Sequence, residues 1–236
     1  MAEPRRDLLS RTQIIGCIRQ GNELQRKYAT TGSVDDLQRA RKAYEEGLES
    51  SNDPYLRAVC LNNMGSALES LFDETHLMDY LNQAIDSKKQ AADLIPVNHQ
   101  QRASFFDGYS GLLQVRLEHS GSMDDLNEAI MAVEEAIRLT PERTSEACMY
   151  LNNFSIALRS RFKRTSVFGD LERAVAVAKL AVESVANNPN RRYHLNGLGI
   201  ALDMQFEWTG SLEHQDRKST RLNSSHTMTS RMPSSA

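Results

Sequence analysis

Two kinds of amphipathic segment alternate along the chain. In residues 147–163, apolar side chains recur at i, i+3, i+7 and i+11, the spacing of one helix face. These are Leu151, Phe154, Leu158 and Phe162. The second kind follows a short polar link. In residues 126–137 it carries a continuous apolar stripe, made of Leu126, Ala129, Ile130, Val133, Ala136 and Ile137. The pattern predicts pairs of helices, here named helix A and helix B.

Start and stop signals delimit helix B. Ser122 precedes the acidic pair Asp124 and Asp125, so its side chain can cap free backbone amides while the carboxylates favour the positive end of the helix. In two copies the pattern ends before a proline, at Pro96 and at Pro141, because proline cannot continue helical hydrogen bonding. Each A–B pair is therefore expected to form a helical hairpin.

The hairpin pattern recurs about every 45 residues. The motif LNNMGSAL begins at Leu61. It returns in similar form at Phe106, Leu151 and Leu195, at steps of 45, 45 and 44 residues. A degenerate copy begins at Cys17, 44 residues before Leu61. A second anchor, the alanine that opens helix B, is spaced by 44, 45 and 45 residues and so stays in register with the first. These alanines are Ala40, Ala84, Ala129 and Ala174.

The period divides residues 10–215 into units near 17–60, 61–105, 106–150 and 151–194, with a fifth unit, 195–215, that breaks off. A small residue stands at one fixed position of helix A, where a larger side chain would push neighbouring helices apart. These residues are Gly21, Gly65, Ser110, Ser155 and Gly199. Units that bury their apolar faces against the next unit form a solenoid. The sequence thus predicts an all-α fold of stacked hairpins.

Composition agrees with a helical chain and disfavours several partners. Only 6% of the residues are aromatic, and 12 glycines and 6 prolines are few for a β-sandwich. A formal net charge of −3 lacks the basic field that drives binding to nucleic acid or anionic membranes. The most apolar stretch, residues 174–182, is about half the length needed to cross a bilayer. The three separated cysteines, Cys17, Cys60 and Cys148, indicate buried thiols in a reducing compartment, so a cytoplasmic location is expected.

The units resemble those of the tetratricopeptide (TPR) repeat family. The resemblance rests on small and apolar positions of helix A and on two alanines and a proline separated by seven and five residues in helix B. In the second unit these are Leu61, Met64, Gly65, Leu68, Ala84, Ala91 and Pro96. The unit is longer than usual, about 45 residues rather than 34. Long units of this type are similar to those of fungal TPR proteins, in which the array often precedes a caspase-like CHAT protease domain. The resemblance implies a right-handed α-solenoid.

By this resemblance, a peptide or protein partner binds in a concave groove lined mainly by helix A. Candidate contact residues directly follow the leading apolar residue of helix A or lie about one and two turns further on. They are Asn62, Ser66, Glu69, Asp107, Gly111, Gln114, Asn152, Ile156, Arg159, Asn196, Ile200 and Asp203. The asparagines can clamp an extended peptide, or they can equally bond the neighbouring repeat. Arg159 is the one cation among these positions, so a clamp for a carboxylate tail is disfavoured.

No constellation of catalytic or metal-binding residues stands out. None of the six histidines lies three or four residues from another histidine or a cysteine, and His76 and His119 fall in the expected link between the two helices. Gly108 and Gly111 lie inside a helix A without a preceding strand, so they do not predict a phosphate-binding loop. We expect no cofactor, no metal and no enzymatic activity. Trp208 is expected either to cover a repeat or to be an exposed anchor.

The last segment, residues 216–236, differs from the repeats in being rich in serine and lacking helical periodicity. DRKSTRLNSSH is identical to the translation of a common sequencing-library adapter, and SRMPSSA matches the far end of that adapter. We therefore expect a non-native, disordered tail. Without its four basic residues and one acidic residue, totals of 28 and 31 become 24 and 30, a net charge of −6.

Three hypotheses of function follow. The first is a non-catalytic protein–protein interaction scaffold that binds its partner in the helix A groove. The alternative implied by the resemblance is a sensor or regulatory arm of a CHAT-type cysteine peptidase whose catalytic domain lies beyond Gln215. A third is self-association through the exposed end repeats.

Overall fold

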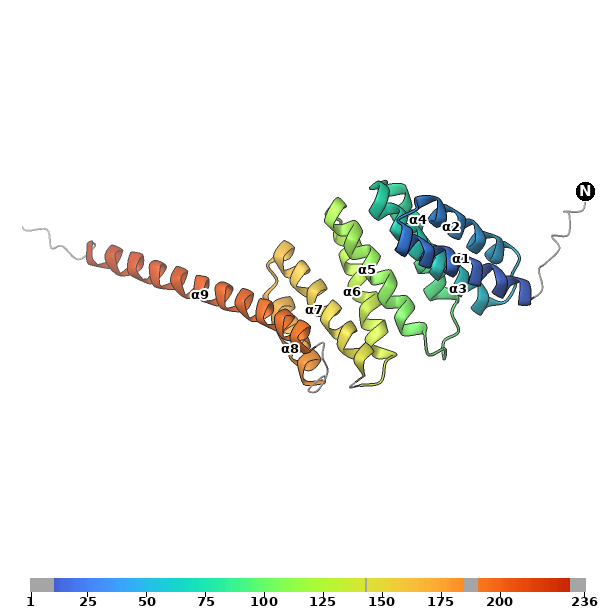
Figure 1. The fold of residues 1–236 in the computed structure, drawn as a ribbon. Helices are drawn as coiled ribbons and strands as arrows, with labels where there is room; N and C mark the ends of the chain where they lie inside the picture. Colours follow the sequence, from blue (N-terminus) through green and yellow to red (C-terminus); the bar gives the residue numbers. More distant parts are fainter. Residues whose placement is uncertain (1–10, 143, 185–190, 230–236) are drawn as a thin grey trace, which may run out of the picture.

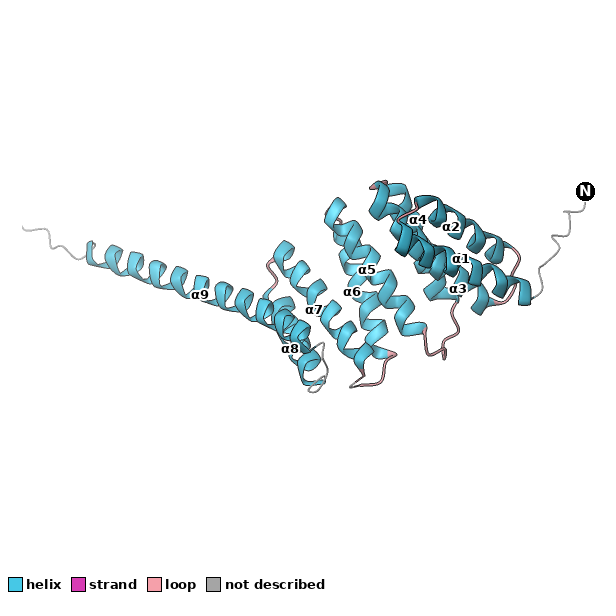
Figure 2. Ribbon diagram, viewed as in Figure 1, coloured by secondary structure: helices cyan, strands magenta, loops and turns pink. Residues whose placement is uncertain are grey.

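The described structure is built from α-helices alone (Figures 1 and 2). The computed structural model describes residues 11–142, 144–184 and 191–229, with the side chains of the last range described as far as residue 210. The helices are α1 (Arg11–Thr31), α2 (Val34–Glu49), α3 (Pro54–Thr75), α4 (Met78–Leu94), α5 (Arg102–Ser120), α6 (Met123–Arg138), α7 (Ser145–Thr165), α8 (Phe168–Ser184) and α9 (Arg191–Thr229). The predicted all-α class is confirmed.

The helices form hairpins that stack side by side. Odd-numbered helices are helix A and even-numbered helices are helix B of the predicted units, and each hairpin packs against the next. In Figure 1, α5–α6 and α7–α8 follow one another along the molecule, and α9 stands at the end of the stack. Apolar clusters are shared between hairpins: Leu37 of α2, Leu68 of α3 and Leu113 of α5 belong to one. This is the predicted α-solenoid, because each apolar face is buried against a neighbouring unit.

The predicted start and stop signals of helix B are confirmed. The Ser122 hydroxyl accepts a hydrogen bond from the backbone N–H of Asp125 at 3.2 Å, which satisfies one free donor at the start of α6. Helix α4 ends at Leu94, before Pro96, and α6 ends at Arg138, before Pro141.

The first four A helices all end on a residue in the left-handed region. Gly32, His76, Gly121 and Ser166 have φ values of 68°, 56°, 69° and 58°. A residue in this conformation lets its N–H bond back to a carbonyl of the last turn, which ends the helix. His76 is therefore a helix cap. His119, expected in the same link, instead lies in the last turn of α5.

The small residue in helix A allows close approach of helix B from the same hairpin. A Cβ added to Gly21 would lie 2.4 Å from the Tyr44 ring, and one added to Gly65 would lie 2.9 Å from the Lys88 side chain. The serines at the same position instead donate to backbone carbonyls of helix B, Ser110 to Ala129 at 2.9 Å and Ser155 to Ala174 at 3.0 Å. Glycine thus occurs where helix B carries a large side chain, and serine where it carries Val133 or Ala178.

An aromatic contact joins successive A helices at two places. The Trp208 ring of α9 packs edge-on against Phe162 of α7, with centroids 5.1 Å apart. At the matching positions, the His119 ring of α5 packs edge-on against Phe72 of α3 at 5.3 Å. Trp208 therefore covers the preceding repeat, one of the two roles expected for it.

Helix α9 differs from the other A helices in length and in exposure. It has 39 residues and continues as helix through Thr229, whereas α7 has 21. The predicted disordered tail therefore differs from the structure over residues 216–229, where neither proline nor glycine interrupts the helix. Residues 230–236 lie outside the described residues. Leu202 and Phe206 are 40% and 77% exposed, while Leu158 and Phe162 at the matching positions of α7 are 0% and 7% exposed, because α8 covers them.

Candidate functional site

The predicted partner-binding residues lie along the A helices, on a surface here named the helix A face. Most of them are at least partly accessible: those of α3 and α5 are half-buried apart from exposed Gly111, and Asn196, Ile200 and Asp203 of α9 are exposed. On α7, Ile156 and Arg159 are half-buried, but Asn152 is only 4% exposed. Asn152 is therefore buried in this structure, unlike the other predicted contact residues.

A lysine that the helix A pattern did not predict reaches the helix A face with its ammonium group. Lys88 belongs to helix B, yet its ammonium Nζ donates to Asn62 Oδ1 at 3.1 Å and to Ser66 Oγ at 2.7 Å on α3. Its side chain passes between Gly65 of α3 and Gly108 of α5, where added Cβ atoms would lie 2.9 Å and 3.6 Å from it. The sequence contains a signal for this placement of Lys88. Only the pair formed by the second and third repeats has glycine at both of these positions, Gly65 and Gly108.

The electrostatics of the helix A face follow from burial. Desolvation lowers the pKa of the Lys88 ammonium, and the nearby Glu69 carboxylate opposes this shift. Burial likewise raises the pKa of Glu69 and of Asp107, and in Asp107 a hydrogen bond from Asn153 opposes the rise. The face therefore holds partly dehydrated groups of both charges, whose hydrogen bonds are stronger than those of fully hydrated side chains.

The second asparagine of each pair in helix A connects neighbouring repeats. The Asn63 side-chain amide donates to Asn22 Oδ1 of α1 at 3.1 Å, and the Asn153 amide donates to Asp107 Oδ1 of α5 at 2.9 Å. The Tyr44 hydroxyl extends the first contact by donating to Asn22 Oδ1 at 2.7 Å. Of the two roles left open by the sequence, the second asparagine of each pair has the stacking role in this structure.

Unpaired donors mark the part of the helix A face on α7. Asn152 Nδ2 and Arg159 Nε are buried and have no hydrogen-bond partner among the described residues. Asn152 lies against α9, where a Cβ added to Gly197 would be 2.7 Å from its Oδ1. Burial lowers the pKa of the Arg159 guanidinium. A buried donor without a partner costs about 1–3 kcal/mol, so each of these groups would gain from an acceptor.

The cysteines and histidines show no arrangement for catalysis within the described ranges. Cys60 and Cys148 are buried and Cys17 is half-buried, all three are free thiols, and burial raises the pKa of Cys60 to about 12. Such thiols are poor nucleophiles, because the thiolate is the reactive form. No group of three metal-ligating side chains occurs in the part of the chain that the structure describes. No described helix is long and apolar enough to span a membrane.

The stack of hairpins with a small residue at one position of each helix A decides the fold class. The fold is a TPR-like α-solenoid. A crystal structure of MamA is 16% identical to this chain over 94% of it and 97% of that protein, with a TM-score of 0.54. Another neighbour is a putative kinesin light chain from Podosopora anserina with nearly identical TPR-like repeats. It is 14% identical over 91% of this chain and 97% of that one, with a TM-score of 0.60.

BtubC (BKLC) from P. vanneervenii is a third TPR-like neighbour, 12% identical over 95% of this chain and 94% of that one, with a TM-score of 0.55. No protein-family model matches the sequence, and no curated protein matches it. The TM-scores of these three neighbours establish a shared TPR-like fold. The helix A face is defined by the residues of this chain alone.

Proposed function

We propose that this chain is a non-catalytic protein-interaction scaffold that binds a peptide or protein segment along the helix A face. The observation that carries the proposal is the unpaired Nε donor of Arg159. Its guanidinium is half-buried on α7, its Nε has no hydrogen-bond partner among the described residues, and no acidic side chain forms an ion pair with it there. Burying the Nε donor without an acceptor costs free energy. A carbonyl or carboxylate oxygen of a bound segment would supply that acceptor.

The other accessible residues of the helix A face suit an extended segment. Gln114 and Asn62 are half-buried and carry amides that both donate and accept. Lys88 is itself buried, and its ammonium bonds Asn62 and Ser66 and so orients these two side chains on the face. A peptide backbone presents N–H and C=O groups in alternation, so a face with both kinds of partner fits it. TPR-like folds generally serve as protein-interaction scaffolds, which supports the same function.

The test is affinity capture from cell extract with the full chain as bait, followed by quantitative mass spectrometry. Arg159→Glu replaces the donor by an acceptor and should remove the specific partners. Arg164→Glu is the matched control, because Arg164 is exposed on the same helix and its Nη1 bonds only the Ser160 carbonyl, at 3.3 Å. Equal capture by wild type, Arg159→Glu and Arg164→Glu, with unchanged helical circular dichroism, would refute the helix A face as the binding surface.

We propose further that residues 216–236 are not native, as their match to an adapter translation indicates. Sequencing the genomic reading frame past Gln215 tests this: a native frame encoding DRKSTRLNSSH would exclude it. The same sequence tests the alternative function, since a downstream CHAT-type domain with a histidine and a cysteine would make this array the regulatory arm of a peptidase.

A further inference from the structure

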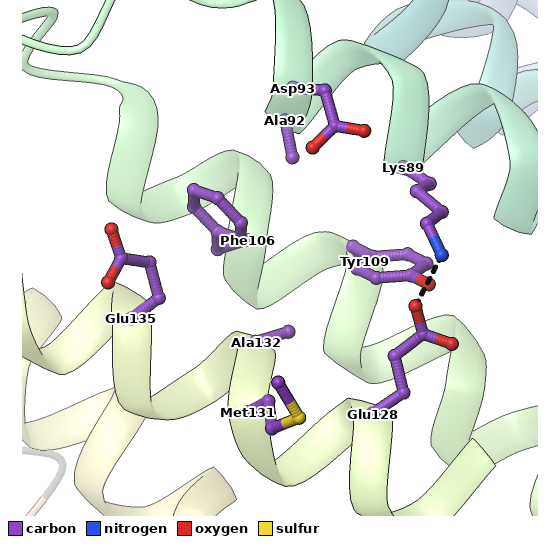
Figure 3. A pocket seen from close by; sticks show the side chains of 9 residues that line it. All are labelled: Lys89, Ala92, Asp93, Phe106, Tyr109, Glu128, Met131, Ala132 and Glu135. Atoms are coloured by element: carbon purple, nitrogen blue, oxygen red, sulfur yellow. Dashed lines mark hydrogen bonds and ion pairs between the residues drawn. The ribbon is translucent and has the colours of Figure 1, made fainter. Parts of the chain in front are cut away.

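A pocket of about 380 Å³ lies between the second and third hairpins, away from the helix A residues described above. Its walls are two B helices, α4 and α6, with α5 between them. Figure 3 shows the Phe106 and Tyr109 rings of α5 between Ala92 of α4 and Ala132 of α6. A volume of this size is at the lower end of the range for ligand-binding pockets, about 300–1,000 Å³.

The pocket exists because one repeat lacks a side chain that the other repeats have. Ala92 stands eight residues after the alanine that opens helix B, where the other units carry Leu48, Ile137 and Val182. Leu48 packs against apolar clusters that connect its hairpin to the next one, and Ile137 packs against a cluster of its own hairpin and the next. Truncating a core leucine or isoleucine to alanine costs about 2–5 kcal/mol, so stability does not favour alanine here.

An exposed apolar side chain is the second unusual feature of this pocket. Met131 lines the pocket and is 69% exposed. At the matching positions the neighbouring repeats carry Asp86 and Ala176, which suit an exposed site. Methionine is a flexible apolar side chain that adapts to varied partners, and it is enriched at binding surfaces. The repeat thus combines a missing apolar side chain with an added exposed one.

The charges at the rim of the pocket are paired, with one exception. Lys89 bonds Glu128, and Arg138 bonds Glu135 with two contacts of 2.6 and 2.7 Å. Arg102 lies over the Phe106 ring at 5.1 Å and donates to the Ile95 carbonyl. Asp93 forms neither a hydrogen bond nor an ion pair among the described residues, although the field of its carboxylate reaches Lys89. The carboxylate of Asp93 is therefore the rim charge left to bind a cation.

We propose that this pocket binds the apolar side chain of a partner peptide that carries lysine or arginine next to it. The apolar side chain, of leucine or methionine size, packs between Phe106, Tyr109 and Met131. The neighbouring basic group forms an ion pair with Asp93. The net negative charge of the chain favours the approach of such a peptide. The site is separate from the helix A face, so either proposal can fail without the other.

The test uses ligand-observed NMR with the full chain and three acetylated, amidated peptides. The first is Ala-Arg-Leu-Arg-Ala, the second has alanine in place of leucine, and the third has glutamate in place of both arginines. Because one buried side chain gives weak binding, a dissociation constant of about 1 mM is expected for the first peptide. Both control peptides should bind at least about tenfold more weakly. Equal binding of all three would overturn the proposal.

Four variants locate the binding. Ala92→Leu fills the pocket with the residue found at position 48 and should weaken binding of the leucine peptide about tenfold or more, while leaving the melting temperature unchanged or raised. Met131→Asp introduces the residue found at the matching position 86. It changes an exposed site, so it removes the apolar wall without threatening the fold. Asp93→Asn should reduce the preference for arginine over glutamate. Ala176→Leu, at the matching exposed position of the next repeat, is the control.

Peptide binding that survives both Ala92→Leu and Met131→Asp would show that the pocket is not the site. Binding of the glutamate peptide as tight as that of the arginine peptide would show that Asp93 does not select the cation. If Ala92→Leu lowers the melting temperature, the Met131→Asp result decides.

Discussion

The guanidinium of Arg116 forms two parallel hydrogen bonds with the carboxylate of Asp125 in the same hairpin, from Nε to Oδ2 at 2.9 Å and from Nη2 to Oδ1 at 2.7 Å. Arg161 and Asp170 repeat this pair in the next hairpin. In the second hairpin the matching residues are Leu71 and Tyr80. An ion pair and an apolar–phenol pair thus occupy the same position in different repeats.

This equivalence predicts that breaking the ion pair destabilises the chain more than exchanging it for the pair of the second hairpin. Asp125 is only 8% exposed, so Asp125→Ala leaves the partly buried Arg116 guanidinium with only the Asn82 Oδ1 acceptor, at 3.0 Å. The variant should lower the free energy of unfolding by about 2 kcal/mol. Arg116→Leu combined with Asp125→Tyr recreates the pair of the second hairpin and should cost less than about 1 kcal/mol. Urea unfolding followed by circular dichroism measures both. A double variant less stable than Asp125→Ala would contradict the equivalence.

The left-handed residues that end the A helices predict that glycine there stabilises the chain and alanine there destabilises it. A non-glycine residue in this region costs about 1 kcal/mol, so Ser166→Gly should stabilise the chain by up to that amount, and Gly121→Ala should destabilise it similarly. Thermal unfolding of both variants provides the measurement. Stabilisation by Gly121→Ala would show that the helix end readjusts.

Gly65 and Gly111 are both helical glycines, but their surroundings differ. A Cβ on Gly65 would lie 2.9 Å from Lys88 Cγ and 3.2 Å from the backbone oxygen of Ala84, whereas one on Gly111 meets nothing within 4 Å. Gly65→Ala should therefore destabilise the chain by about 1–3 kcal/mol, through overpacking of the hairpin. Gly111→Ala should stabilise it by about 0.5–1 kcal/mol, since alanine favours the helix. Chemical denaturation compares the two, and equal effects would disprove the close approach at Gly65.

Burial of the Lys88 ammonium predicts a specific dependence of stability on pH. The folded pKa of Lys88 lies below the ordinary value of 10.5, so the unfolded chain binds more protons in the interval between the two values. The penalty for burying the charged amine is complete below the folded pKa and disappears as the pH rises toward 10.5. Over that interval, the free energy of unfolding of wild type should rise relative to that of Lys88→Met. A constant difference across the interval would rule out a buried, protonated Lys88.

The exposed apolar residues of α9 predict weak self-association. Leu195, Leu202 and Phe206 are 43%, 40% and 77% exposed on one helix that lacks a covering helix B among the described residues. Static light scattering should show a mass that rises with concentration in wild type. Leu202→Ser with Phe206→Ser should reduce this rise, whereas Leu77→Ser, at another exposed leucine, should not. A mass independent of concentration would argue against association through α9.

Much of the fold was predictable from local patterns. Ser122, Pro96 and Pro141 delimit helix B through backbone chemistry that depends only on nearby residues. The position of His119 was predicted wrongly, because the last turn of a helix depends on where a left-handed residue ends it. The match of Gly21 and Gly65 with large residues of helix B, and of Ser110 and Ser155 with small ones, was not predicted. The signal was present, since residues 44, 88, 133 and 178 share one position of the repeat.

The candidate sites were less predictable. The position of Asn62 on the helix A face followed from its place in the motif, but the same reasoning put Asn152 there, and α9 buries it. Lys88 belongs to the other helix of its hairpin, and only the two glycines beside it allow its ammonium to reach that face. Ala92 and Met131 are unremarkable residues by composition, and the pocket between them exists only once two hairpins are stacked.

Patterns along the chain were enough to establish the all-α class, the period near 45 residues and the register of the hairpins, because helix periodicity and capping are local properties. The packing of the hairpins was needed to establish which polar side chains remain accessible, which asparagines bond a neighbouring repeat and where an apolar pocket opens. These depend on how neighbouring repeats differ in size at matched positions. Because protein interiors are closely packed, one smaller side chain between two repeats leaves a space. At Ala92 this space is a pocket, and at Gly65 and Gly108 it is filled by the Lys88 side chain.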